Sequence, residues 1–359
     1  MQFQNDPLCD QKWATLLSKT VYFAIQNGPL CEIRKKYSTL YLLNRFFHYL
    51  CLHIMRLSII IPVYNVKGTL RRCIDSILKM DMGDYEIVLV DDGSTDGSSE
   101  LCDEMAQGTN RIRVIHQQNR GLSAARNTGL KRSHSEYVTF VDSDDFLDSQ
   151  TFPKLMAILR VHTEYDILEY PAVIAYGSQH QHRLALGKKE YSDMKQYWIG
   201  GQAYAHAYAW NKVYRRELFS GIRFPEGKAF EDVFALPLVL ERAQTVATTS
   251  QGTYYYCYND KGITATAGSK ELSDLLEDHK VYIETYTNKD DWHTREFATY
   301  FTHVLNILLD AVSDDRIWKE VAQHTPSTSL KLTLMKLCGI SFLRCINTLW
   351  HKIIPRKHF

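Results

Sequence analysis

The residues with the clearest chemical potential are three carboxylates within 142–145, directly after the apolar run 137–141. Acids packed this closely at the end of a buried strand repel one another, because little water screens them. A divalent cation relieves that repulsion, and hard oxygen ligands suit Mg²⁺ or Mn²⁺. We therefore predict a metal site at Asp142, Asp144 and Asp145, where the cation also holds the phosphates of a ligand.

A second acidic pair, Asp91 and Asp92, follows the apolar run 86–90. Residues 91–97 are rich in Asp, Gly and Ser, which is also the composition of a plain turn followed by a helix cap. In a functional interpretation, a carboxylate at this strand end accepts hydrogen bonds from a nucleobase or a ribose hydroxyl. The helix that follows then presents its N-terminus to phosphate. Spacing alone leaves both interpretations open.

A third pair, Glu231 and Asp232, precedes a helical stretch. Acids at this position complement the helix dipole without any further role. With a metal site upstream, one of the two also becomes a candidate general base that takes a proton from an attacking hydroxyl. The pair is therefore a catalytic candidate that depends on the acidic loop.

Arg120, Arg126 and Trp210 are further candidates, each with a structural alternative. The two arginines flank the turn 121–125, where they meet phosphate or pair with the acidic loops. Trp210 is suited to stacking on a sugar face, although a large aromatic side chain is more often part of a core. The sequence does not separate these possibilities.

Strands must alternate with helices over residues 57–147 to position these side chains. Continuous apolar runs predict strands buried on both faces, and apolar residues at helical spacing separate them. The predicted strands are 57–64, 86–90, 111–116 and 137–141. Such alternation predicts an α/β fold with a mostly parallel central sheet flanked by helices. Ligands bind outside the carboxyl ends of such strands, where Asn65 and the acids at 91–92 and 142–144 fall.

Composition narrows the class of protein. The chain has 359 residues and a formal net charge of +1, which argues against nucleic-acid binding by global electrostatics. Its 8 cysteines form no Cys-x-x-Cys pair, so we expect reduced thiols in a cytoplasmic protein. Walker A, Gly-x-Gly-x-x-Gly, Gly-x-Ser-x-Gly and His-Glu-x-x-His motifs are absent. Their absence excludes P-loop NTPases, dinucleotide enzymes, α/β-hydrolases and zincins.

Four motifs together resemble the opening of family 2 glycosyltransferases, in that family's order. They are residues 58–65, 90–97, 119–127 and 142–145. The resemblance is strong over about residues 57–150 and continues more weakly through 210–212 and 231–232 to near Tyr258. Residues 1–54 and those beyond about 270 fall outside it.

The resemblance implies a GT-A fold, a nucleotide-diphosphate sugar donor with UDP preferred, and inversion at the anomeric carbon. Carried over by motif, Pro62, Tyr64 and Asp91 hold the nucleotide, with Asp92 close by. Asp142 and Asp144 form the metal-binding Asp-x-Asp, with Asp145 as a possible third member. Asp232 is the base that deprotonates the acceptor hydroxyl, with Glu231 beside it.

The predicted binding site for the nucleotide-sugar donor combines these motif residues with the other candidates described above. The nucleotide-sugar-binding set is Pro62, Tyr64, Asn65, Asp91, Asp92, Arg120, Arg126, Asp142 and Trp210. Such enzymes commonly build bacterial surface polysaccharides on glycan or lipid-linked acceptors at the cytoplasmic membrane face. Two alternatives are a sugar-phosphate nucleotidyltransferase, expected to carry a Gly-rich basic loop after the first strand, and a non-catalytic sugar-nucleotide binder, expected to have lost one of the acids.

The chain divides into four predicted parts. Residues 1–54 are an extension of unknown role, with Met55 as an alternative start; 55–265 are the GT-A domain, 266–328 a helical region and 329–359 a tail. Residues 321–359 contain no Asp or Glu, but they carry six lysines and arginines among apolar side chains. A basic amphipathic tail suits an interfacial helix on anionic lipid. Packing on the protein's own helices is the equal alternative.

Overall fold

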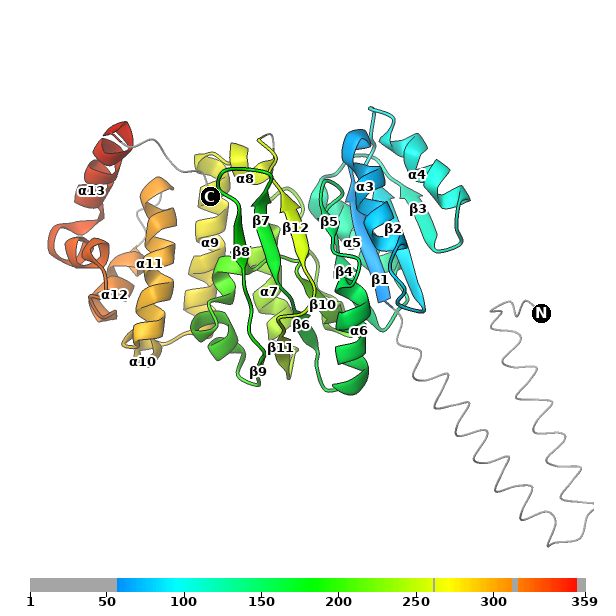
Figure 1. Ribbon diagram of the computed structural model, residues 1–359. Helices are drawn as coiled ribbons and strands as arrows, with labels where there is room; N and C mark the ends of the chain where they lie inside the picture. Colours follow the sequence, from blue (N-terminus) through cyan, green and yellow to red (C-terminus); the bar gives the residue numbers. More distant parts are fainter. Residues whose placement is uncertain (1–56, 261, 312–315, 354–359) are drawn as a thin grey trace, which may run out of the picture. The chain divides into compact units, whose positions relative to one another are not determined.

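The computed structural model describes residues 57–260, 262–311 and 316–353, and every structural statement below concerns these ranges (Figure 1). The predicted extension 1–54 and the alternative start at Met55 lie outside the described residues. The described residues all belong to one compact unit.

A mixed sheet of eight strands is the centre of the described fold. Its strands are β1 (Leu57–Val63), β2 (Tyr85–Asp91), β3 (Ile112–His116), β4 (Tyr137–Phe140), β6 (Ile167–Glu169), β9 (Lys189–Tyr191), β10 (Lys212–Arg215) and β11 (Val246–Thr248). Their order is β3-β2-β1-β4-β10-β6-β11-β9, with β10 and β9 antiparallel to their neighbours. The predicted mostly parallel α/β sheet is confirmed.

The central strand β1 is buried along its whole length. Ile59 and Ile61 point into one hydrophobic cluster, while Ile60 points into the other. Pro62 is tolerated in this strand because pairing with β4 ends at Ile60, which accepts a hydrogen bond from Val141 N. The backbone nitrogen of Pro62 points to the same side of β1 as that of Ile60, beyond the last pair with β4. The N–H that proline lacks therefore removes no hydrogen bond between the strands.

Helices cover both faces of the sheet. One face carries α3 (Lys67–Leu78), α4 (Ser98–Gln107) and α6 (Thr151–Val161), and the other carries α5 (Leu122–Arg132) and α7 (Glu231–Leu240). Gly129 sets the distance between α5 and β1, since a Cβ atom there would lie 2.3 Å from Ile60 Cγ2. The close approach holds α5, the helix that carries Arg126, near the sheet.

A second sheet of four strands supports the acidic loop. Its strands are β5 (Phe146–Leu147), β7 (Ala172–Tyr176), β8 (His182–Leu184) and β12 (Tyr254–Cys257), in the order β5-β12-β7-β8. Strand β5 follows residues 142–145 directly and pairs with β12. Short helical turns complete this part of the chain at Gln196–Gly200, Ala203–His206 and Arg216–Phe219.

The C-terminal part is helical, as predicted (Figure 1). Its helices are α8 (Ile263–Thr266), α9 (Ser269–Tyr286), α10 (Lys289–Trp292), α11 (Arg295–Asp310), α12 (Arg316–His324) and α13 (Leu330–Ile353). Helix α11 lies between α9 and α13 and buries Phe297, Phe301, Val304 and Leu308 at helical spacing. Helix α9 in turn contacts α7, which connects the bundle to the predicted catalytic pair.

The predicted tail is the helix α13, and it divides into two faces. Leu332, Met335, Ile340 and Leu343 are buried in the hydrophobic cluster of the bundle, whereas Phe342, Ile346 and Leu349 are exposed. By length and composition alone, Leu330–Leu349 is the one stretch of the described residues long and apolar enough to cross a membrane. Gly339, with a φ of +80° and a ψ of 170°, is not helical and divides α13 into two helices at a kink.

Three of the cations that suggested binding to anionic lipid have protein partners. Lys331 Nζ donates to Asn306 Oδ1 at 2.6 Å, Lys336 Nζ donates to the carbonyl of Thr325 at 2.5 Å, and Arg344 donates to carbonyls at the end of α11. These residues attach α13 to its own bundle, so they do not form a free basic face.

Candidate active site

One buried arginine joins the two acidic segments that the sequence placed far apart. Arg126, on α5, is 2% exposed. Its Nη2 donates to Asp142 Oδ1 at 3.0 Å, and its Nη1 donates to Glu231 Oε1 at 2.5 Å and to Asp232 Oδ1 at 2.7 Å. Of the two predicted roles for Arg126, pairing with the acidic loops is the one that the structure contains.

The charges of this cluster compensate one another. Burial alone would lower the pKa of Arg126, but the three carboxylates around it raise that pKa instead. Burial raises the pKa of Glu231 to about 7, although the Arg126 charge opposes the shift. Burial likewise raises the pKa of Asp232 against the same opposing charge. Both acids therefore hold a proton more readily than ordinary carboxyls, as suits a general base near neutral pH.

Helix α7 presents both acids from its first turn. Phe230, which precedes them, has a φ of +58°, a left-handed conformation that is costly for a bulky residue. This turn aims Glu231 and Asp232 at Arg126, and Asp232 Oδ2 also accepts a hydrogen bond from Ala209 N at 3.0 Å. The base candidate is thus held through both of its oxygens.

The predicted metal ligands fall into two groups. Asp142 lies at the carboxyl end of β4 with its side chain 22% exposed, and Asp144 Oδ2 accepts a hydrogen bond from Asn259 at 3.1 Å. Burial raises the pKa of Asp144, and the nearby charge of Asp142 raises it further. A cation would be held by these two carboxylates, which suits Mg²⁺ or Mn²⁺ because these ions take few protein ligands beside phosphate oxygens. Within the described ranges, no group of three or more His, Cys, Asp or Glu side chains is arranged so that it could hold a metal ion.

Asp145, which was predicted as a metal ligand, has other partners in the structure. It is completely buried, and its two oxygens accept hydrogen bonds from Cys257 N at 2.7 Å and from the Tyr254 hydroxyl at 2.8 Å. Burial raises its pKa well above the ordinary value. Because both partners lie on β12, Asp145 fastens the acidic loop to the second sheet.

Trp210, which was predicted to stack on the sugar, is packed among other aromatic rings. It is 3% exposed, and its ring stacks on Tyr208, Tyr254 and Tyr256 at centroid distances of 4.5, 4.3 and 5.5 Å. Tyr254 hydrogen bonds to the acidic loop through Asp142 N as well as Asp145. Trp210 therefore supports the loop from behind, and the core alternative is the correct one.

The predicted nucleotide residues gather at the end of β1 and β2. Pro62 is buried within β1, whereas Tyr64 is half exposed just beyond it. Asn65 has a φ of +52°, and its side chain accepts a hydrogen bond from Thr95 N at 2.8 Å, which ties this loop to the turn after Asp91. Tyr64 and Asn65 are the exposed members of this group, whereas Asp91 is 3% exposed.

Asp91 has a partner that the sequence analysis did not single out. Its Oδ2 lies 2.9 Å from His116 Nδ1, and its Oδ1 accepts a hydrogen bond from Ser94 N at 3.0 Å. Burial opposes ionisation, but these hydrogen bonds hold the pKa of Asp91 below its ordinary value. His116 ends β3, so its place at a strand end was the signal that pointed to it.

Asp92 and Arg120 have structural partners in the same region. Asp92 accepts hydrogen bonds from Gln117 Nε2 at 2.6 Å and from the backbone N–H groups of Arg120 and Gly121 at 3.0 and 2.7 Å. It thereby shapes the loop that leads into α5. The Arg120 side chain lies 3.3 Å from Glu226 and is more than half exposed.

A cavity of about 340 Å³ opens beside the catalytic pair. Glu231 forms part of its wall, together with the start of α5, the loop before α7 and the first turns of α9. Its lining residues include Arg120, Ser123, Lys228, Glu231, Thr266 and Lys270. Glu231 lines this cavity together with the acids Glu271 and Asp274, whereas its neighbour Asp232 is not a lining residue.

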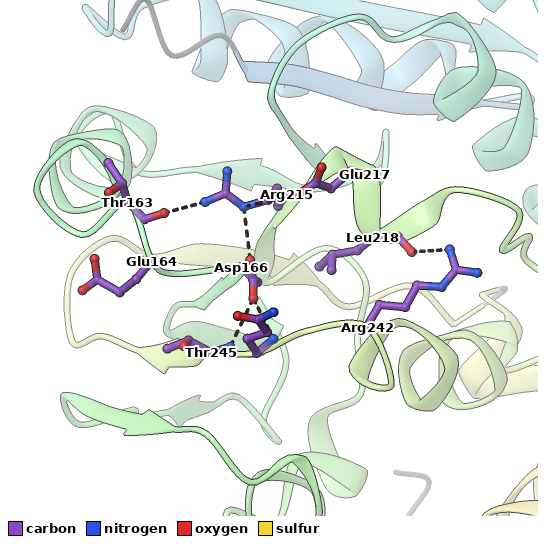
Figure 2. Close-up of a pocket in the computed structure, with 9 residues that line it drawn as sticks. Thr163, Glu164, Asp166, Arg215, Glu217, Leu218, Arg242 and Thr245 are labelled. Carbon is purple, nitrogen blue, oxygen red and sulfur yellow. Dashed lines mark hydrogen bonds and ion pairs between the residues drawn. The ribbon is translucent and has the colours of Figure 1, made fainter. Parts of the chain in front are cut away.

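A second cavity, of about 410 Å³, lies at the opposite edge of the sheet (Figure 2). Asp166 and Thr245 line it where β6 and β11 begin, at the amino ends of these parallel strands. Arg215 Nε lies 3.1 Å from Asp166 Oδ1, and Asp166 Oδ2 accepts hydrogen bonds from the backbone of Gln244 and Thr245. These groups connect strand ends to one another, and the predicted site residues lie at the other edge.

The fold and the site define a class of protein: a Rossmann-like sheet with carboxylates converging at its carboxyl edge. The family model for glycosyl transferase family 2 matches residues 58–223. The chain is 31% identical to the putative glycosyltransferase EpsH of Bacillus subtilis over 338 residues, which cover 84% of this chain and 97% of that protein. The chain belongs to glycosyl transferase family 2.

Other relatives share only part of their length with this chain. It is 36% identical to the glycosyltransferase GlyA of Streptococcus pneumoniae but spans 30% of that protein, and it spans 66% of the uncharacterized glycosyltransferase EpsJ of Bacillus subtilis. Among solved structures, S. aureus TarS 1–349 in complex with UDP-GlcNAc has a TM-score of 0.60 at 18% identity, with 83% of this chain and 92% of that chain covered. The mannosyltransferase PcManGT from Pyrobaculum calidifontis, in complex with GDP-Man and Mn²⁺, has a TM-score of 0.51 at 15% identity, with 83% and 88% covered. The predicted GT-A-like fold is confirmed.

Proposed function

We propose that this glycosyltransferase moves a sugar from a nucleotide-diphosphate sugar, with UDP preferred, to an acceptor hydroxyl with inversion and with help from a divalent metal. The observation that carries the proposal is the shared contact of Arg126 with Asp142 and Asp232. It holds the acid expected at the leaving group and the acid expected at the nucleophile in one rigid cluster. A single displacement needs these two functions at a fixed separation.

In this reaction Asp232 accepts the proton of the acceptor hydroxyl as its oxygen bonds to the anomeric carbon. The bond between that carbon and the diphosphate oxygen breaks at the same time, and its electron pair leaves with the nucleoside diphosphate. Asp142 and Asp144 would hold Mg²⁺ or Mn²⁺, which when bound neutralises the departing diphosphate. Tyr64 and Asp91 bind the nucleoside. Arg126 favours the ionised form of the base, because its charge opposes the rise in the pKa of Asp232 that burial causes.

The cavity beside Glu231 is the proposed entrance for the acceptor. Its volume of about 340 Å³ is large enough for a sugar ring, and polar side chains surround it. Ser123→Trp and Lys270→Ala should raise the KM for the acceptor while leaving the dissociation constant of the donor unchanged. If only the dissociation constant of the donor rose, the acceptor would have to bind at another site.

We place the reaction in bacterial surface polysaccharide synthesis, at the inner face of the cytoplasmic membrane and on a glycan or lipid-linked acceptor. EpsH, and the minor teichoic acid biosynthesis protein GgaB of Bacillus subtilis at 28% identity, support this context. Phe342, Ile346 and Leu349 support contact with the bilayer through their exposed stripe on α13. The triple change of these residues to Ser should release the protein from vesicles of mixed neutral and anionic lipid. Unchanged binding of the triple variant to the vesicles would show that these side chains of α13 do not contact the bilayer.

The central experiment screens nucleotide sugars with purified protein and measures the product of the nucleotide. Release of nucleoside diphosphate supports glycosyl transfer, whereas release of pyrophosphate would indicate nucleotidyl transfer. Asp232→Asn should abolish transfer while leaving donor binding intact, and Asp144→Ala should weaken Mn²⁺-dependent donor binding as well. Asp81→Asn is a suitable control, since Asp81 is exposed and lies in the loop before β2. Full activity of Asp232→Asn would refute the assignment of the base.

A further inference from the structure

Lys212 is a completely buried cation that is not part of the proposed reaction. It begins β10, and its Nζ donates hydrogen bonds to the carbonyls of His206 and Tyr208 at 2.8 and 2.9 Å and to Asn211 Oδ1 at 2.7 Å. A buried ammonium is costly to desolvate, so its retention calls for a role that an apolar side chain could not fulfil.

Glu169 neutralises Lys212 from the end of β6. It is also completely buried, with Oε1 3.1 Å from Lys212 Nζ and 2.7 Å from His206 Nδ1, and Oε2 accepts a hydrogen bond from the Tyr197 hydroxyl at 2.8 Å. Burial would raise the pKa of Glu169, but the charges of Lys212 and His206 hold it at about 2. Burial lowers the pKa of Lys212, and the facing charge of Glu169 opposes that shift.

One peptide group connects this ion pair to the proposed base. The carbonyl of Tyr208 accepts the hydrogen bond from Lys212, and the N–H of the same planar peptide, that of Ala209, donates to Asp232 Oδ2 at 3.0 Å. Because C=O and N–H of a trans peptide point in opposite directions, the ammonium, the peptide and the carboxylate form one continuous line of hydrogen bonds. A cation at the carbonyl polarises the peptide and strengthens the bond that its N–H donates.

We propose that Lys212 is a positioning residue for the base, acting through the 208–209 peptide to orient Asp232 and to favour its ionised form. This inference rests on the proposed function of Asp232. It assigns a task to the buried ion pair of Glu169 and Lys212 and to residues 206–209, which the reaction otherwise leaves unexplained. The tyrosine and tryptophan rings around this segment keep water from competing with the line of hydrogen bonds.

The test compares Lys212→Met with the double variant Lys212→Met/Glu169→Gln. The single variant leaves Glu169 buried without its counterion and is expected to lose stability, whereas the double variant removes both charges and should fold. The double variant should bind the donor as the wild type does, but its kcat should fall about tenfold or more. The acidic limb of its kcat–pH profile should move to higher pH, because a base deprived of a donor and a nearby cation has a raised pKa.

A backbone substitution isolates the peptide itself. Replacing Ala209 by its α-hydroxy acid analogue removes the N–H and keeps the side chain, and it should shift the pH profile in the same direction. Tyr197→Phe is the matched control, since it removes a hydrogen bond to Glu169 without touching Lys212, and its pH profile should be that of the wild type. Wild-type kcat and an unshifted pH profile in the folded double variant or in the Ala209 analogue would overturn the proposal. Activity of Asp232→Asn would instead overturn the assignment of the base, so the two failures are distinguishable.

Discussion

Arg126 donates a hydrogen bond to Asp232 at 2.7 Å, although the two residues are 106 positions apart in the chain. The same guanidinium contacts Asp142, so it connects the carboxyl edge of the sheet to the first turn of α7. Side chains held by a buried fork of this kind have little rotational freedom. The side chains of the proposed active site are therefore preorganised before substrate binds.

Replacing Arg126 by Met should lower the free energy of unfolding by about 3–5 kcal/mol, because three carboxylates then face each other without a counterion. The loss in the free energy of unfolding should be smaller at pH 5 than at pH 8, since protonation of those acids relieves their repulsion. Urea denaturation at both pH values measures it. Arg120→Met is the control: its pair with Glu226 is exposed, and its loss should cost at most about 1 kcal/mol.

Asp145→Asn should leave the Mn²⁺ dependence of donor binding unchanged, because both oxygens of Asp145 accept hydrogen bonds from β12. An amide keeps an acceptor for Cys257 N and offers a donor to the Tyr254 oxygen. Asp144→Asn should weaken the Mn²⁺-dependent binding roughly tenfold or more. Calorimetric titration of the donor with and without Mn²⁺ distinguishes the two variants. If both lost the same Mn²⁺-dependent donor affinity, Asp145 would be a metal ligand after all.

Stability should depend on pH through Glu231. Its pKa rises from the ordinary 4.5 to about 7 on folding, so between these values the native protein keeps a proton that the unfolded chain has released. The free energy of unfolding contributed by this group is therefore fully present below about pH 4.5 and is lost as the pH rises through about 7. Glu231→Gln should flatten the pH dependence in this window, as thermal unfolding at constant ionic strength would reveal.

Trp210→Ala should destabilise the fold by about 3–5 kcal/mol, the usual cost of truncating a buried aromatic residue. Trp210→Phe retains a ring against Tyr208 and Tyr254 and should keep the donor KM of the wild type. A large rise in the donor KM of Trp210→Phe at unchanged stability would speak for direct contact with the sugar. Steady-state kinetics and denaturation of the two variants together decide the matter.

The sequence by itself determined the strands, their parallel order and the acids at their ends. Continuous apolar runs such as 57–63 have only one stable use, a strand covered on both faces, and parallel strands bring their carboxyl ends to one edge. Asp91, Asp142 and Asp144 were therefore correctly placed at that edge. The four family motifs, which lie on or next to these strand ends, identified the class of enzyme.

Only the tertiary structure decided which neighbours each of these side chains has. Asp145 and Asp144 are adjacent in the chain, yet β12 buries one and leaves the other near the opening. Because β10 runs antiparallel to β4, its first residue, Lys212, and Trp210 just before it lie near the carboxyl edge of the sheet. There Trp210 packs on Tyr254 in the core, where the sequence had predicted a contact with the sugar. Burial and pairing depend on segments more than 100 residues away, such as Arg126 with Asp232, and periodicity within one segment carries no information about them.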